Sequence, residues 1–124
     1  MFDDHTEILY KISEIKKDET ALTKITELSS KKSPRHVLLA WSLLKKDNND
    51  WVLQKATEVG VTHFAPILSD RSEKTGFNIN RALKIVIEAS EQCGRIDIPV
   101  IDDVRDLKNL VNTFKDSYVL YACD

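Results

Sequence analysis

Polar side chains gather in the stretch EASEQCGR, residues 88–95, where a helical pattern ends. Glu91 and Gln92 offer a carboxylate and an amide, and the guanidinium of Arg95 can bind a carboxylate, a phosphate or a backbone carbonyl. The group could therefore hold an anionic or hydrogen-bonding ligand. It could also be a structural junction at the end of an amphipathic helix. The residues alone leave both interpretations open.

A second candidate, Arg71, follows a predicted strand in the segment DRS, residues 70–72. In open parallel sheets, ligands bind outside the carboxyl ends of the strands, so Arg71 is expected at a ligand-binding edge. An ion pair with Asp70 explains the same residues equally well. Lys45 and Lys46 follow the preceding predicted strand and could contact phosphates at the same edge. A solvated lysine-rich surface remains the alternative for these two.

The elements that must position these groups are read from hydrophobic periodicity. Residues 7–28 predict two strands around a polar turn at 16–19, and residues 29–34 resemble a linker. The later pattern predicts a strand at 37–44, a helix at 47–59, a strand at 61–68, a helix at 79–93, a strand at 96–101, a helix at 104–114 and a strand at 118–122. This order predicts an α/β fold with a parallel sheet and right-handed crossovers.

Four details of the helices are also predicted. Asp47 or Asp50 is expected to cap the first helix, and Gly60 and Gly94 are expected to end the first and second helices. In the helix at 79–93, the spacing predicts one buried side formed by Ile79, Leu83, Val86, Ser90 and Cys93. Lys55 and Glu58 are expected to form a structural ion pair in the first helix.

Composition limits the class of protein. Charged residues make up 31% of the 124 residues with a net charge of −2, which is typical of a globular protein rather than a disordered one. No apolar run approaches the roughly 20 residues that span a bilayer, so no membrane association is expected. Cys93 and Cys123 form no zinc or disulfide pattern, which favours a cytoplasmic protein without a metal site.

Four motifs in order resemble one family. They are KKDNNDWVLQKATEVGV at 45–61, APILSDRS at 65–72, EASEQCGR at 88–95 and Ile98-Pro99. Together they closely resemble the RsmE family of small-subunit ribosomal RNA methyltransferases, in the SPOUT superfamily, over most of the chain. The resemblance implies that residues 31–124 form the N-terminal part of a SPOUT-like (α/β-knot) domain with helices on both faces of the sheet. It implies that residues 1–30 are a remnant of a PUA-like β barrel.

The activity implied by the resemblance is transfer of a methyl group from S-adenosylmethionine to N3 of a uridine in 16S ribosomal RNA, by a homodimer. Arg71, Glu91, Gln92 and Arg95 match recurrent polar positions of the family. The two arginines are expected to act on RNA or substrate charge, and Glu91 and Gln92 to orient them or the base. Positive charge would stabilise the anion formed when N3 loses its proton. The RNA contacts are expected from Lys45, Lys46 and Arg71.

The sequence departs from the family pattern at its carboxyl end. The glycine-rich GPEGG segment of the family's cofactor-binding knot would follow the last predicted strand, where this sequence reads YACD. The cofactor-binding residues and the knot are therefore expected beyond Asp124, and the 124 residues alone are expected to be inactive. A noncatalytic RNA-docking or dimerisation module derived from the same family is the alternative.

The order of the elements also limits which side chains can share a site. In a simple wound sheet, the helix at 79–93 ends at the edge opposite to Arg71. Arg71 and Arg95 would then meet only if the loop at 69–78 tilts that helix, or if a second subunit brings the two groups together.

Overall fold

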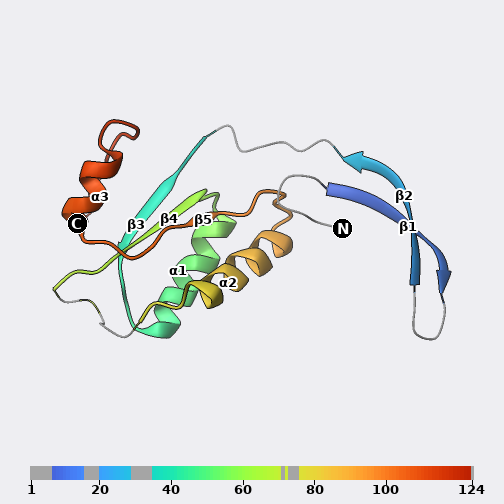
Figure 1. Cartoon of the computed structure of the whole chain (residues 1–124), viewed down its shortest axis with the longest axis horizontal. Helices are drawn as coiled ribbons and strands as arrows, with labels where there is room; N and C mark the ends of the chain where they lie inside the picture. Colours follow the sequence, from blue (N-terminus) through green and yellow to red (C-terminus); the bar gives the residue numbers. More distant parts are fainter. Residues whose placement is uncertain (1–6, 16–19, 29–34, 71, 73–75, 124) are drawn as a thin grey trace.

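The computed structural model describes residues 7–15, 20–28, 35–70, 72 and 76–123. Its elements, in chain order, are β1 Glu7–Ile15, β2 Thr20–Leu28, β3 Leu38–Ser42, α1 Lys46–Glu58, β4 His63–Ile67, α2 Ile79–Gln92, β5 Val100–Ile101 and α3 Leu107–Phe114 (Figure 1). β1 and β2 pair antiparallel in a sheet of their own, as the sequence predicts. The predicted turn at 16–19 and the predicted linker at 29–34 lie outside the described residues.

The main sheet is parallel and has the order β3-β4-β5. Leu38 pairs with His63 at one end of the β3–β4 ladder, and Ser42 pairs with Ile67 at the other. β5 has only two residues, although the sequence predicted a strand from residue 96. Pro99 directly precedes β5 and has no backbone N–H to give to a ladder, which helps to explain the late start.

The predicted strand at 118–122 is wrong, because the described residues 115–123 contain no strand. Val119 is 77% exposed and Tyr121 is 87% exposed, so these apolar side chains do not pack on the sheet. β-forming residues make a strand only where a neighbouring strand and a face to pack on are available.

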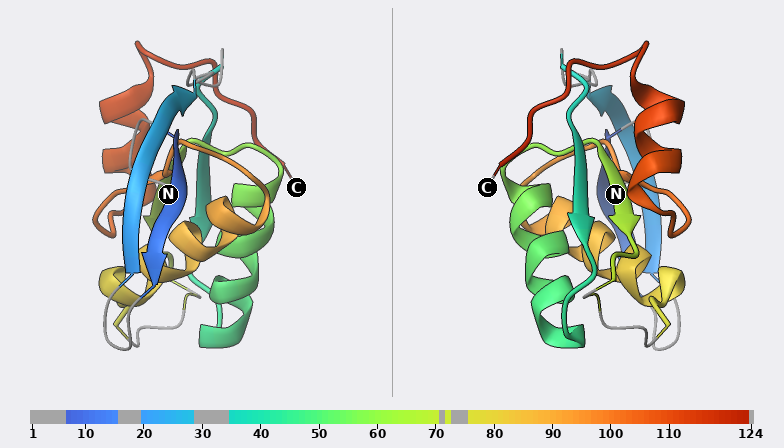
Figure 2. Two further views of the ribbon diagram at one scale, coloured as in Figure 1. Left: turned by 90° about the vertical axis from the view of Figure 1, so that its right-hand side faces the viewer. Right: turned by 90° about the vertical axis from the view of Figure 1, so that its left-hand side faces the viewer.

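Helices cover both faces of the sheet, as predicted. Leu53 of α1 and Val86 of α2 pack with Phe64 of β4 in one buried cluster. On the opposite face, Leu110 of α3 packs against Ala65 and Ile67. The alternation of Phe64 and Ala65 along one strand sends their side chains into these two clusters. Figure 2 shows α3 on one side of the sheet and the α1–α2 pair on the other.

The glycine caps are confirmed, since Gly60 and Gly94 follow α1 and α2 with φ of 106° and 74°. The predicted aspartate cap is wrong. Within the described range 35–70, α1 begins after Lys45 and makes no side-chain capping hydrogen bond. The same helix contains the predicted ion pair, in which Lys55 Nζ lies 3.1 Å from an oxygen of Glu58.

The buried face of α2 differs in part from the predicted one. Val86 and Ser90 are buried as expected, but Ala82 and Ala89 complete the face. Ile79, Leu83 and Cys93 are exposed instead. The hydroxyl of Ser90 donates to the carbonyl of Val86 over 2.7 Å, which satisfies this polar group in the core.

Candidate functional site

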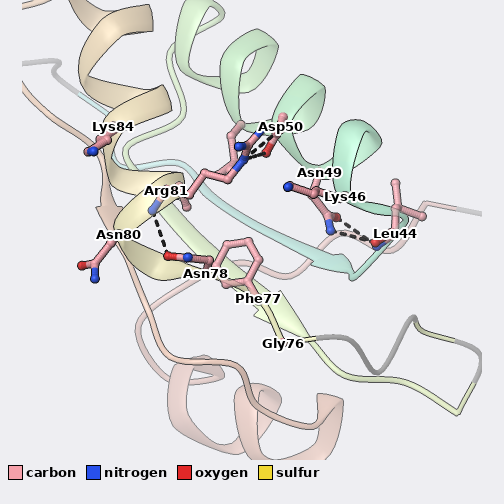
Figure 3. A pocket seen from close by; sticks show the side chains of 12 residues that line it. Leu44, Lys46, Asn49, Asp50, Gly76, Phe77, Asn78, Asn80, Arg81 and Lys84 are labelled. Carbon is pink, nitrogen blue, oxygen red and sulfur yellow. Dashed lines mark hydrogen bonds and ion pairs between the residues drawn. The ribbon is translucent and has the colours of Figure 1, made fainter.

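A cleft of about 570 Å³ opens where α1 and α2 begin, at the carboxyl edge of the parallel sheet. α1 starts just after β3, and the backbone N–H of Leu43 donates to the carbonyl of Ile67 at the end of β4 over 3.0 Å. The polar and aromatic side chains of the lining include Lys46, Asn49, Asp50, Phe77, Asn78, Arg81 and Lys84 (Figure 3). The lining contains three cations, Lys46, Arg81 and Lys84, and one carboxylate, Asp50, so it is net positive.

One wall of the cleft is fixed by Asn49, a buried residue of α1. Its Oδ1 accepts from the backbone N–H of Leu44 over 2.9 Å and from Nε1 of Trp41 over 3.1 Å. Its Nδ2 donates to the carbonyl of Leu44 over 2.8 Å. These bonds tie the first turn of α1 to the end of β3. Asparagine side chains often hydrogen bond to nearby backbone groups, and this tendency is the sequence signal that could have pointed to Asn49.

The cleft is bridged by Arg81 of α2 and Asp50 of α1 (Figure 3). Arg81 Nε lies 3.3 Å and 3.2 Å from the two carboxylate oxygens, and Nη2 lies 2.5 Å from Oδ2. The hydrogen bonds that Arg81 donates to Asp50 raise the pKa of Arg81, because they stabilise the charged guanidinium. The side chain of Asn78 accepts from the Arg81 backbone N–H over 3.0 Å and caps α2.

The predicted RNA-binding residues have three different outcomes. Lys46 lines the cleft. Lys45 is exposed beside it at the cap of α1. Arg71 lies outside the described residues. The next residue, Ser72, is described, and its Oγ accepts a hydrogen bond from the backbone N–H of Ser69 over 2.9 Å in the segment after β4. The structure therefore places one predicted lysine in the cleft and the other next to it.

Arg95 lies at the opposite, amino edge of the sheet. Its Nη1 donates to the carbonyls of Thr57 and Val61, over 2.7 Å and 2.8 Å. Nη2 and Nε pair with Asp97, and the Arg95 side chain is only 13% exposed. Since Val61 precedes β4 and Ser72 follows it, the two edges are separated as the simple wound sheet predicts. These contacts support the structural-junction interpretation, and a role of Arg95 in catalysis stays a prediction.

Glu91 and Gln92 lie exposed near the end of α2, outside the cleft. They line a separate groove of about 490 Å³ together with Trp51 of α1, which is 63% exposed. The Arg81–Asp50 pair contributes to both cavities. Within one subunit, therefore, Glu91 and Gln92 do not line the same cavity as Lys46.

Among the residues that the structure describes, no group of three or more His, Cys, Asp or Glu side chains is arranged to hold a metal ion. His63 makes structural contacts instead. Its Nε2 lies 3.0 Å from Oδ1 of Asp102, and its ring packs edge-to-face against Phe114. No helix of this part of the chain is long and apolar enough to cross a membrane.

Comparison with known proteins connects this architecture to one family. A ribosomal RNA small subunit methyltransferase E from Rickettsia conorii is 27% identical over 116 residues, which are 94% of this chain and 47% of that protein. The protein of the same name from Bacillus subtilis is 34% identical over 89 residues, 67% of this chain and 35% of its own. The chain thus spans about half or less of the length of these curated relatives.

The fold is also shared with solved structures. A ribosomal RNA small subunit methyltransferase E from Neisseria gonorrhoeae, bound to S-adenosyl methionine, superposes with a TM-score of 0.76 at 26% identity. The match covers 89% of this chain and 48% of that one. The family model of the RNA methyltransferase domain matches residues 31–124. On this match, the chain belongs to the RNA methyltransferase domain family, and its curated relatives confirm the resemblance to RsmE proteins.

Proposed function

We propose that this chain is the RNA-facing part of an enzyme that transfers a methyl group from S-adenosylmethionine to N3 of a uridine in 16S ribosomal RNA. The observation that carries the proposal is the net positive cleft, with Lys46, Arg81 and Lys84, at the ligand-binding edge of a sheet of this family. RNA presents phosphates to such a surface. The rRNA or the small ribosomal subunit is the proposed partner.

The cofactor does not fit this cleft. S-adenosylmethionine carries a sulfonium cation, and a lining with three cations and one carboxylate would repel it. Among the described residues, Gly60, Gly76 and Gly94 are spread over different segments and form no glycine-rich cradle. We therefore propose that the cofactor-binding residues and the knot lie beyond Asp124. We also propose that residues 1–30 belong to a PUA-like β-barrel segment and residues 31–124 to the methyltransferase domain.

The proposed roles of the family positions depend on a homodimer. Arg71 follows β4, whereas Glu91, Gln92 and Arg95 follow or end α2 at the other edge. A second subunit that presents its amino edge to the carboxyl edge of the first would bring the two sets together. Arg71 would then stabilise the uridine anion, and Glu91 and Gln92 would orient the base.

The proposed location is the cytoplasm. Cys93 and Cys123 are both free and exposed, which suits a reducing compartment.

Calorimetric titration tests the placement of the cofactor site. S-adenosylmethionine is titrated into the 124-residue chain and into a chimera that continues with the carboxyl half of the Bacillus subtilis relative. We expect binding by the chimera alone, and no methyl transfer by the 124 residues alone. Binding by the short chain would show that the cofactor site is misplaced. A folded chimera that binds nothing would favour a noncatalytic RNA-docking module.

A further inference from the structure

We propose that the cleft binds a backbone phosphate of the RNA, and that Arg81 exchanges its partner Asp50 for that phosphate. The inference rests on the proposed function in one respect, which is that the ligand is RNA. It adds an RNA-contacting residue, Arg81, that is not among the candidates named from the sequence, and a defined role for Asp50.

The position of the cleft favours an anion. α1 has 13 residues and α2 has 14, and both helices begin at this cleft, so the positive ends of both dipoles lie there. Lys46 and Lys84 add two exposed cations to the lining. Arg81 adds a planar fork whose geometry matches the oxygens of a phosphate.

The pair between Arg81 and Asp50 is easily exchanged. The Arg81 side chain is 49% exposed and that of Asp50 is 25% exposed, so water reaches both charges. An ion pair in contact with solvent contributes little to stability, and its loss on RNA binding costs little. In the absence of RNA, Asp50 holds the fork across the cleft (Figure 3), and its carboxylate opposes the approach of a phosphate.

The walls around this pair are fixed in advance. Phe77 packs edge-to-face against Trp41, with ring centroids 6.0 Å apart, and Trp41 is hydrogen bonded to Asn49. Phe77 is half-buried and gives the cleft an apolar surface beside the cations. A site with fixed walls and an exchangeable salt bridge can admit a phosphate without rearrangement of the helices.

The test is binding of a fluorescently labelled, uridine-containing RNA hairpin to the 124-residue chain, followed by anisotropy over a range of salt concentrations. Arg81→Ala is expected to raise Kd about tenfold and to reduce the magnitude of the salt slope by about 1. Asp50→Asn is expected to lower Kd, because it removes the competing carboxylate. Lys108→Ala, an exposed charge on α3 across the sheet, is the matched control and should change neither.

Thermal unfolding of each variant separates binding from folding. The proposal is overturned if the wild-type chain does not bind the hairpin, if Arg81→Ala equals Lys108→Ala, or if Asp50→Asn weakens binding. If the Arg81–Asp50 salt bridge served only to hold the fold, Asp50→Asn would weaken binding. These outcomes can be distinguished from a failure of the proposed methyl transfer, because RNA binding is measured without cofactor. If the chimera methylates RNA and Arg81→Ala has no effect on RNA binding, only the proposed phosphate site is refuted. If the cleft binds RNA but the chimera transfers no methyl group, only the proposed enzymatic function is refuted.

Discussion

Replacing Arg95 with alanine is expected to lower the free energy of unfolding by about 3 kcal/mol. The change removes two hydrogen bonds to the carbonyls of Thr57 and Val61 and leaves Asp97 without its cation. These bonds tie the segment after α2 to the end of α1 and the start of β4. Urea denaturation measures the effect. A loss of this size is a large fraction of the roughly 5–15 kcal/mol that stabilises a domain.

The control variants separate charge from geometry. Arg95→Lys keeps the charge but cannot donate to two carbonyls and a carboxylate at once, so most of the stability should still be lost. Asp97→Asn keeps an acceptor and should cost less. If Arg95→Ala unfolds at the same urea concentration as the wild type, while turnover of a full-length chimera falls, the catalytic prediction holds and the structural junction does not.

The pH dependence of stability is an independent test of the contact between Arg95 and Asp97. The hydrogen bond from Arg95 lowers the pKa of the Asp97 carboxyl below its usual value, and burial partly opposes this shift. The carboxyl therefore contributes stability that is fully present above its unfolded pKa of about 3.9, and that is lost as the pH falls through its lower folded pKa. Below about pH 4, the stability of Arg95→Ala should depend less steeply on pH than that of the wild type.

Replacing Asn49 with alanine is expected to cost about 2–3 kcal/mol of stability. Asn49 is buried and makes three hydrogen bonds, and its removal leaves the backbone N–H and carbonyl of Leu44 and the indole N–H of Trp41 without this partner. The first turn of α1 would no longer be fixed to β3, so RNA affinity should fall as well. Thermal unfolding and hairpin binding measure the two effects.

A matched control for this change stands on the other side of the cleft. Asn80 also lines the cleft but is exposed, so Asn80→Ala should leave the melting temperature nearly unchanged. Equal stability of the two alanine variants would contradict the assignment of Asn49 as the tie between β3 and α1. Loss of stability without loss of RNA affinity would show that the cleft does not need this wall.

The order of strands and helices along the chain, and hence a parallel sheet, could be predicted because each element carried a local signal. The apolar run around β3 was bounded by polar residues, and Gly60 and Gly94 stand where a left-handed residue ends a helix. The strand predicted at 118–122 failed because its signal was equally local, whereas a strand depends on a neighbour. The exposure of Val119 and Tyr121 shows that no such neighbour is present among the described elements.

The candidate site could be predicted only in part, for the same physical reason. Lys46 was expected at the carboxyl edge because it follows a strand directly. Arg81 was missed because nothing in the local sequence pattern shows that Asp50 of α1 lies across from it. The sequence shows that the Arg95 guanidinium can donate hydrogen bonds, but it does not show the acceptors. These acceptors, the carbonyls of Thr57 and Val61, are 38 and 34 residues away in sequence.

Methylation of 16S rRNA is measured by nucleoside mass spectrometry after incubation of small ribosomal subunits with S-adenosylmethionine and the chimera. We expect N3-methyluridine with the wild-type chimera, and a clear loss with Arg81→Ala although cofactor binding is unchanged. A folded chimera that binds S-adenosylmethionine but forms no N3-methyluridine would rule out the proposed methyl transfer.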